Sequence, residues 1–244
     1  MTTACIIGAS AGLGLALARA LAKQGHNLFL VAQDARDLGA IAADLALTCS
    51  VNVRTAALDI NTADPDELVR LACDPFGHID HLLFVAGLSQ ANDAPGLADA
   101  DVNRLLQTNF CAPVRIINAF IPHLLSRPKA SVTGAGSVAS IRARRRNVHY
   151  GAAKSGLEFY FSGLRHAFSD TPCRIQYYRL GYLDTQMTFG QRLLFPAAKP
   201  ERVASDVVSS LGIDRVGTYL PGWWRFIAIA LHGLPWRVFR RLDF

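Results

Sequence analysis

The sequence predicts an α/β fold in which a doubly wound parallel sheet carries helices on both faces. Short apolar runs of strand length alternate with longer Ala- and Leu-rich stretches of helix length. Glycine or serine follows several of these apolar runs. The composition agrees, because 244 residues with 51% hydrophobic and 18% charged side chains can bury one sizeable core. We therefore expect a single domain over residues 1–244, without internal repeats.

The first unit of the chain predicts a strand, a glycine-rich turn and a helix. An apolar run at 4–7 precedes the turn, and helix formers occupy 15–22. The turn contains Gly8, Ser10, Gly12, Leu13 and Gly14. Its glycines allow a pyrophosphate to approach closely, and the free N–H groups of the helix N-terminus face such an anion. The spacing matches neither the Gly-x-Gly-x-x-Gly fingerprint nor a P-loop, so a plain glycine-rich turn is the alternative.

The remaining elements continue the alternation. We expect strands at 27–31, 51–58, 81–85, 131–135 and 174–180, and helices at 37–47, from Asp64 onward, at 102–125 and around Tyr150. This order predicts right-handed βαβ units, in which ligands bind at the carboxyl ends of the strands. Gly8, Gly87, Ser137 and Gly181 each follow a predicted strand, so we expect them at the same edge of the sheet.

Tyr150 and Lys154 are spaced to share one helix face. An ammonium ~4 Å from the phenol, at an effective dielectric of ~20, is worth up to about 4 kcal/mol. We therefore expect Lys154 to lower the pKa of Tyr150 towards neutrality. Ser137, thirteen residues before Tyr150, could share the same substrate oxygen. Tyr-x-x-x-Lys also arises by chance on amphipathic helices, so the other motifs decide between the two interpretations.

With these positions in hand, the chain resembles the short-chain dehydrogenase/reductase family over nearly its whole length. The matching positions are Gly8, Gly12 and Gly14, the adenine-side Asp59, Ala86 and Gly87, Asn109, Ser137, Tyr150, Lys154 and the segment from Arg179 to Thr185. Val85 and Leu180 depart from the pattern, because the family usually has asparagine and proline there. The resemblance implies a Rossmann-like domain and hydride transfer between a nicotinamide and a carbonyl or alcohol carbon.

The resemblance also implies roles for individual residues. Tyr150 would be the acid/base, Ser137 would stabilise the substrate oxygen, and Lys154 would also hold the nicotinamide ribose. Asn109 would position a water that links Lys154 to solvent. The expected cofactor-binding residues are Gly8, Ser10, Gly12, Leu13, Gly14, Gln33, Asp59, Ile60, Ala86, Gly87, Tyr150, Lys154, Gly181 and Thr185. No metal site is expected.

The choice between NAD and NADP stays open. An acid at the end of the second strand would favour NAD, and an arginine there would favour NADP. We expect Ala32 and Gln33 at this point, and neither gives such a signal. Asp34 could reach the ribose, although a solvated loop aspartate explains it equally well.

Charge indicates the class of substrate. From Val102 to Leu157 there is no Asp or Glu but nine Lys or Arg, four of them Arg142, Arg144, Arg145 and Arg146. We expect this loop to border the mouth of the site, where guanidinium groups favour an anion such as phosphate. A solvated loop or a subunit contact is the alternative. Nucleic acid is not expected, because no aromatic residues alternate with these arginines.

Residues 222–244 predict an apolar and basic helical tail. Trp224, Ile227, Leu231, Leu234 and Val238 form one helical stripe, with arginines elsewhere. Such a stripe suits an interfacial helix on an anionic membrane or a lid over a lipid-like substrate. Packing on the core or on another subunit is the alternative. The tail is too interrupted to span a bilayer, and Pro235 predicts two short helices.

Within the family, the stretch from Ser137 to Gly151 and the tail are similar to the decaprenylphosphoryl 2-keto-ribofuranose reductases, which reduce a keto-pentose carried on a polyprenyl phosphate. This similarity implies an anionic, lipid-linked substrate and peripheral membrane contact. A soluble reductase of small ketones and a non-catalytic nucleotide sensor are the alternatives. The family resemblance implies a homodimer or homotetramer. Five scattered cysteines and the glycine motif at the very start favour a cytoplasmic protein without a signal peptide.

Overall fold

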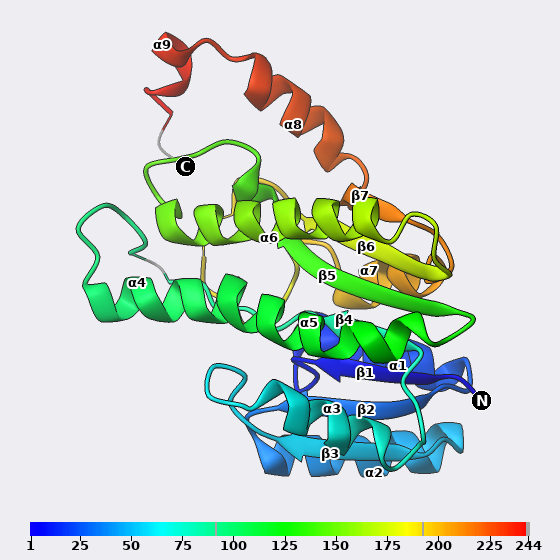
Figure 1. The fold of residues 1–244 in the computed structure, drawn as a ribbon. Helices are drawn as coiled ribbons and strands as arrows, with labels where there is room; N and C mark the ends of the chain where they lie inside the picture. Colours follow the sequence, from blue (N-terminus) through cyan, green and yellow to red (C-terminus); the bar gives the residue numbers. More distant parts are fainter. Residues whose placement is uncertain (91, 192, 243–244) are drawn as a thin grey trace.

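The computed structural model describes residues 1–90, 92–191 and 193–242. Within them, one seven-stranded parallel sheet has the strand order β3-β2-β1-β4-β5-β6-β7 (Figure 1). The strands are β1 (Thr3–Ile7), β2 (Asn27–Ala32), β3 (Val53–Ala57), β4 (His81–Phe84), β5 (Ala130–Ser137), β6 (Cys173–Leu180) and β7 (Arg215–Leu220). The order reverses between β1 and β4, which creates a crevice at their carboxyl ends.

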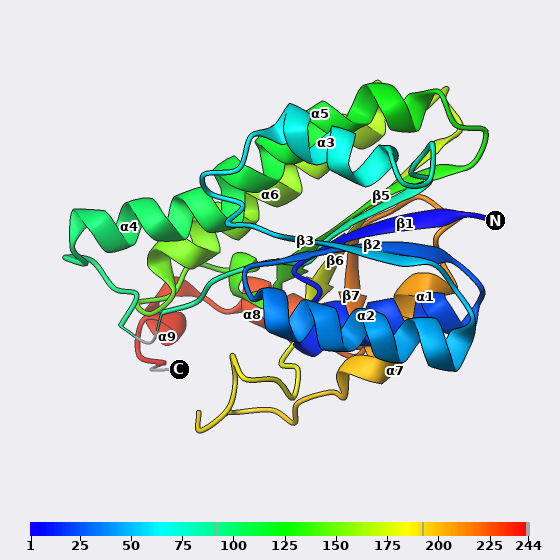
Figure 2. The ribbon, with the colours of Figure 1, turned by 90° about the horizontal axis from the view of Figure 1, so that it is seen from below.

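Helices cover both faces of this sheet, as the sequence predicts. The helices are α1 (Gly12–Lys23), α2 (Ala35–Cys49), α3 (Pro65–Cys73), α4 (Asp99–Leu106), α5 (Ala112–Leu125), α6 (Val148–Ala167), α7 (Pro200–Val208), α8 (Trp224–Gly233) and α9 (Trp236–Phe239). Figure 2 shows α1, α2 and α7 on one face and α3, α5 and α6 on the other. This is the doubly wound, Rossmann-like α/β fold.

The two faces have separate hydrophobic cores, and β1 contributes to both. Every residue of β1 is buried, with Ala4 and Ile6 in one core and Cys5 and Ile7 in the other. Successive side chains of a strand point to opposite faces, so a strand covered on both sides is apolar at every position. This explains why the predicted strands appear in the sequence as continuous apolar runs.

Small residues on β5 bring α6 close to the sheet. A Cβ on Gly134 or Gly136 would overlap the ring of Phe161 or Tyr177. The Tyr177 hydroxyl donates to the backbone oxygen of Lys154 over 2.8 Å. The glycines and this hydrogen bond together fix the height of α6 above the carboxyl end of β5.

The expected elements are present, with shifted ends, and two elements were missed. The predicted helix at 102–125 is divided into α4 and α5 by a π-helical turn, Gln107–Cys111. The sequence analysis did not anticipate α7 or β7. The strand β7 was missed because its sequence, Arg-Val-Gly-Thr-Tyr-Leu, lacks an apolar run. Most of its residues are only half-buried.

The C-terminal segment, residues 222–242, forms two short helices separated at Pro235, as predicted; the last two residues of the predicted tail lie outside the described residues. The apolar stripe faces the body of the protein through α8, where Trp224 is buried. It does not continue into α9, because Val238 is exposed and Phe239 is buried instead. Over the described ranges, no helix combines the length and apolarity needed to cross a membrane.

Candidate active site

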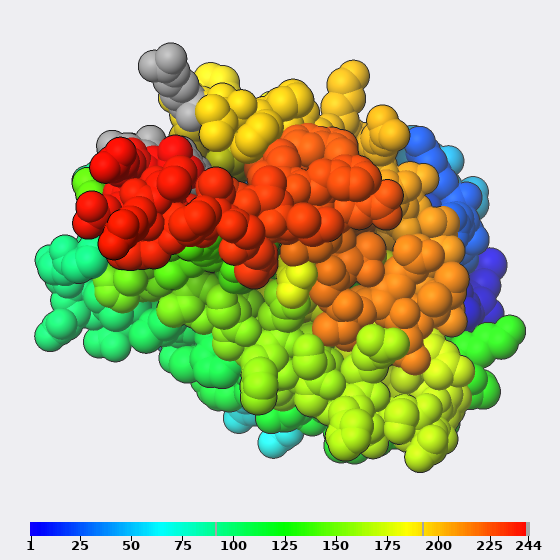
Figure 3. All heavy atoms as spheres, turned by 90° about the horizontal axis from the view of Figure 1, so that it is seen from above, coloured from blue at the N-terminus to red at the C-terminus, as the bar shows by residue number. Residues whose placement is uncertain are grey.

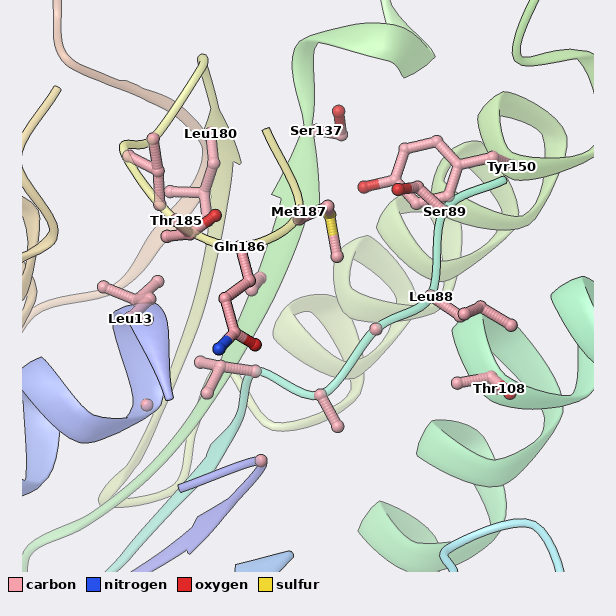
Figure 4. Close-up of a pocket in the computed structure, with 18 of the residues that line it drawn as sticks. Leu13, Leu88, Ser89, Thr108, Ser137, Tyr150, Leu180, Thr185, Gln186 and Met187 are labelled. Carbon is pink, nitrogen blue, oxygen red and sulfur yellow. The ribbon is translucent and has the colours of Figure 1, made fainter. Parts of the chain in front are cut away.

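A cavity of about 960 Å³ opens at the carboxyl ends of the central strands (Figure 4). It is lined by all the residues expected to bind cofactor, namely Gly8, Ser10, Gly12, Leu13, Gly14, Gln33, Asp59, Ile60, Ala86, Gly87, Tyr150, Lys154, Gly181 and Thr185, and also by Ser137. Val85 and Leu180, which differ from the usual residues of the family, also line this cavity. Asn109 is absent from the lining and lies behind it.

The glycine turn has the properties of an anion site. Gly8 has a φ of +95°, and a Cβ there would lie 2.6 Å from the backbone nitrogen of Ala86. A Cβ on Gly14 would overlap the backbone oxygen of Gly8. The N-cap of α1 is Ala11, whose side chain makes no capping hydrogen bond, and the first turn contains no acid. These features leave helix N-terminal N–H groups facing the cavity and fit a dinucleotide pyrophosphate.

Acidic residues line the other end of the cavity. Asp34 caps α2, because its Oδ1 accepts from the backbone nitrogens of Arg36 at 2.8 Å and Asp37 at 3.1 Å. These backbone hydrogen bonds, that from Asp37 foremost, lower the pKa of Asp34. Asp59 accepts from the backbone nitrogen of Asn61 at 2.9 Å. Both carboxylates therefore have fixed orientations beside Gln33, where an adenosine would lie.

Lys154 is buried in the floor of the cavity. Its side chain reaches under Tyr150, with Nζ 5.8 Å from the ring centroid, and Nζ donates to the backbone oxygen of Ala135 at 2.9 Å. A Cβ on Gly87 would lie 3.4 Å from this Nζ, so the glycine leaves room for the ammonium. Burial lowers the pKa of Lys154 to about 8.

The pKa of Tyr150 corrects one expectation. Burial raises the pKa of this phenol above its ordinary value, and a hydrogen bond with the Ser137 side chain opposes the rise. The expected lowering by Lys154 is wrong for the protein without cofactor, because the ammonium is itself desolvated and bonded to Ala135. Tyr150 therefore carries its proton at neutral pH.

Ser137 completes a pair of hydroxyl groups. Its Oγ accepts from the backbone nitrogen of Ala139 at 3.1 Å, in the short 3-10 turn Val138–Ser140. With that interaction as acceptor, the hydroxyl proton is available for donation. Figure 4 shows the Tyr150 hydroxyl extending toward the side of the cavity where Ser137 lies.

Asn109 holds the loop after β4 through its side chain. Its side chain is fully buried in the π-helical turn. The Oδ1 atom accepts from the backbone nitrogen of Leu88 at 3.1 Å. The Nδ2 atom donates to the backbone oxygens of Leu88 at 2.7 Å and Leu105 at 3.0 Å. These bonds occupy the amide, so the side chain holds the loop after β4, and the expected role of Asn109 in positioning a water stays a prediction.

Several lining residues carry no sequence motif and were missed. Arg104 lines the cavity from α4. Thr108 approaches from the π-helical turn, and Gln186 and Met187 come from the segment between β6 and α7 (Figure 4). Only Arg104 had a signal in the sequence, because it belongs to the stretch without acids.

The arginines of the loop at 142–146 point to two different parts of the protein. Arg144 and Arg146 line the cavity, as predicted. Arg142 corrects the prediction, because it points away to the C-terminal segment. Its Nη1 donates to the backbone oxygens of Leu231 and, at 2.7 Å, of Leu234, and its guanidinium lies 4.0 Å from the ring centroid of Phe239. Arg142 therefore fastens α8 and α9 to the loop after Ser137.

A second connection joins the start of α8 to the cavity wall. The Trp224 ring contacts Tyr182 and Phe195 edge-to-face, at centroid distances of 5.3 and 5.2 Å. A Cβ on Gly181 would overlap the Trp224 indole, so the glycine is required for this close contact. The C-terminal segment is thus attached to both loops that border the cavity.

The fold and this site define a nucleotide-binding oxidoreductase. The family model described as short chain dehydrogenase matches residues 2–192. The chain therefore belongs to the short-chain dehydrogenase family and is an NAD(P)-dependent enzyme, with the choice between NAD and NADP open.

Relatives and solved structures agree with this assignment. An uncharacterised oxidoreductase of Mycobacterium tuberculosis is 29% identical over 238 residues, covering 97% of this chain and 95% of the relative. The structure of an alcohol dehydrogenase from Thermococcus sibiricus, complexed with 5-hydroxy-NADP, is 27% identical with a TM-score of 0.80, covering 89% of this chain and 94% of that one. A Burkholderia cenocepacia short chain dehydrogenase in complex with NADP, 22% identical over 88% of this chain and 96% of its own, has the same fold with a TM-score of 0.79.

Proposed function

We propose that the protein transfers hydride between NAD(P) and a carbonyl or alcohol carbon, with Tyr150 as the acid/base. The supporting observation is the pair of Tyr150 and Ser137 hydroxyls, which share one region of the cavity above the buried Lys154. When bound, the nicotinamide supplies or accepts the hydride.

In the reducing direction, Tyr150 donates its proton to the substrate oxygen while Ser137 donates a hydrogen bond to the same atom. The raised pKa of Tyr150 keeps that proton in place until the oxygen gains charge. Lys154 is charged below pH about 8 and stabilises the phenolate left behind. In the oxidising direction Tyr150, as the phenolate stabilised by Lys154, accepts the proton of the alcohol.

Replacement of Tyr150 tests this chemistry. We expect Tyr150→Phe to lower kcat by roughly 10² to 10⁴, which is the usual contribution of a general acid. Cofactor affinity, measured by fluorescence titration, should be retained. Tyr160→Phe is a matched control, because Tyr160 lies on the same helix and bonds Asn118 instead. Undiminished turnover by Tyr150→Phe would refute the proposal, and cofactor binding without turnover of any carbonyl compound would indicate a nucleotide sensor.

We further propose that the substrate is anionic, and specifically a keto-sugar linked to a polyprenyl phosphate. Arg104, Arg144 and Arg146 all line the cavity, whereas its acids, Asp34 and Asp59, lie at the adenosine end. Guanidinium groups favour a phosphate because they form bidentate, charge-assisted hydrogen bonds with it. A small neutral ketone, the alternative substrate, would make no use of these charges.

Comparison of charged and neutral substrates tests the anionic preference. We expect kcat/KM for a keto-sugar phosphate to exceed that for the neutral keto-sugar. Arg146→Gln should remove most of that preference, by roughly tenfold or more, since a hydrogen bond to a charged group contributes about 1.5–3 kcal/mol. Arg145→Gln is the control, because Arg145 lies outside the cavity lining. Equal kcat/KM for both substrates in the unmodified enzyme would contradict the proposal.

The outer surface of the C-terminal segment supports peripheral membrane contact. Exposed apolar side chains gather there and on the neighbouring segment between β6 and α7, namely Phe189, Leu194, Trp223, Phe226, Ile229, Trp236, Val238 and Leu242. Figure 3 shows the two segments side by side on one face. From Arg215 to Leu242 the chain has five Arg and no Asp or Glu. An apolar face surrounded by arginines matches an anionic bilayer surface.

Vesicle flotation tests this contact. We expect the protein to bind phosphatidylglycerol-containing vesicles, to release them at high salt and to bind phosphatidylcholine vesicles weakly. Phe226→Ser combined with Ile229→Ser should lower binding more than tenfold, since each buried side chain contributes about 1.5–3 kcal/mol. Leu47→Ser is the control, because Leu47 is also exposed but lies on α2, at the opposite end of the molecule (Figure 1). Absence of flotation, or an equal loss in the control, would reject membrane contact.

We also propose a homodimer or homotetramer built partly on α6. Phe159 on this helix is 83% exposed, which is unusual for a phenylalanine and suits a subunit contact. Sedimentation of Phe159→Asp should then show smaller species than the unmodified protein, and an unchanged sedimentation coefficient would contradict this contact. We propose no nucleic-acid partner.

A further inference from the structure

A buried carboxylate that the sequence analysis did not identify holds the start of α6, the helix that carries Tyr150 and Lys154. Asp93 lies in the loop between β4 and α4, and only 1% of its surface is exposed. Its Oδ2 accepts from the backbone nitrogen of Tyr150 at 2.8 Å. Its Oδ1 accepts from the backbone nitrogen of His149 at 3.0 Å and from the His149 ring Nδ1 at 2.6 Å. The backbone oxygen of Asp93 accepts from Asn147 at 2.7 Å.

The helix needs this cap because its own N-cap provides none. Asn147 precedes α6 with a φ of +66°, and its side chain makes no capping hydrogen bond. The first N–H groups of a helix have no partner within the helix, and a capping side chain normally comes from the N-cap residue. In this protein the cap comes from Asp93, 57 residues before Tyr150. A carboxylate at this end is also favoured by the helix dipole.

The same contact fixes one wall of the cavity. The loop from Leu88 to Gln90 lines the cavity, and Asn109 holds Leu88 at one end of this loop. Asp93 ties the following part of the loop to α6. The loop is therefore anchored both behind the site and to the backbone of Tyr150.

We propose that Asp93 is a positioning residue for Tyr150, an inference that rests on the proposed function of Tyr150. Asp93 lies outside the cavity lining. It acts by fixing the backbone nitrogen of Tyr150, and through it the place of the phenol relative to Ser137. Displacement of a reacting group by about 1 Å can cost roughly 10²-fold in rate.

Asp80 offers a matched control for this inference. It is also a buried loop aspartate that joins separate elements, because it accepts from the backbone nitrogen of Thr3 at 2.8 Å and from Arg127 Nε at 2.9 Å. It lies directly before β4, at the opposite edge of the sheet from the cavity. Loss of either carboxylate removes comparable structural contacts, but only Asp93 contacts the catalytic helix.

The experiment compares kcat, cofactor Kd and unfolding midpoint across these variants. We expect Asp93→Ala to lower kcat about 10- to 100-fold with cofactor Kd little changed, and Asp93→Asn, which retains one acceptor oxygen, to recover part of that loss. Asp80→Asn should lower the unfolding midpoint with kcat unchanged. The inference is overturned if folded Asp93→Asn and Asp93→Ala keep full kcat, or if Asp80→Asn lowers kcat as much. Should Tyr150→Phe remain active, the proposed function itself fails, which is a separate outcome.

Discussion

The catalytic centre and the C-terminal segment place side chains in opposite and unusual environments. Lys154, a cation, is only 3% exposed, whereas Ile229, an aliphatic residue, is 69% exposed. Folded proteins normally bury aliphatic groups and expose ammonium groups. Such departures persist where function requires them, so each marks a place where a partner outside the chain is expected. The buried cation lies in the floor of the cavity, and the exposed apolar face is the one for which we propose membrane contact.

The largest expected effect on the free energy of unfolding comes from the burial of Lys154. The unfolded chain holds the Lys154 proton up to its ordinary pKa of 10.5, whereas the folded protein releases it at about 8. The unfolded state therefore binds more protons between these values, and stability increases with pH through this window. At about 1.4 kcal/mol per unit, burial costs about 3 kcal/mol at pH 7.

Lys154→Met should remove this cost in the protein without cofactor. We expect the unfolding free energy of Lys154→Met, relative to the unmodified protein, to fall by about 1 kcal/mol between pH 7 and pH 9. Urea denaturation at the two pH values measures it. Lys129→Met, at an exposed position, is the control. A relative stability of Lys154→Met that is constant with pH would mean that Lys154 is not the strained group.

A smaller effect is expected where the two regions meet, at Gly181 and Trp224. Gly181→Ala forces a Cβ into the indole and should destabilise the protein by about 1–3 kcal/mol. In a Trp224→Leu background the same change should cost much less, and a double-mutant cycle measures the difference. Gly222→Ala serves as a control, because a Cβ there meets no atom within 4 Å. If the free-energy changes of the two substitutions simply add, the contact between Gly181 and Trp224 does not couple the C-terminal segment to the cavity wall.

The smallest effect is expected on the exposed face itself. Phe226→Ser with Ile229→Ser should change the unfolding free energy by less than about 1 kcal/mol, because neither side chain is buried in the chain. Thermal unfolding without vesicles measures this. A loss above about 2 kcal/mol would instead place this face at a contact between subunits and weaken the membrane proposal.

The sequence predicted most of the fold because the central strands are covered on both sides and are therefore continuously apolar. The reacting groups were also recognisable, since Ser137, Tyr150 and Lys154 are chemical types placed at strand ends or at helical spacing. Asp93 was missed, because a cap that comes from 57 residues away leaves no local pattern. The direction of Arg142 was missed too, because neighbouring arginines of one loop look alike until their partners are placed.

The paired attachment of the C-terminal segment has a consequence for protein engineering. Arg142 binds the far end of this segment, and Trp224 at its near end packs against Gly181. In both contacts the two partners are distant in sequence. Residues 222–242 are therefore not a module that can be exchanged alone. A chimera that grafts them onto another short-chain dehydrogenase should also receive Arg142, Gly181 and Phe195. Without these residues the grafted segment would lose the contacts that hold it against the cavity wall.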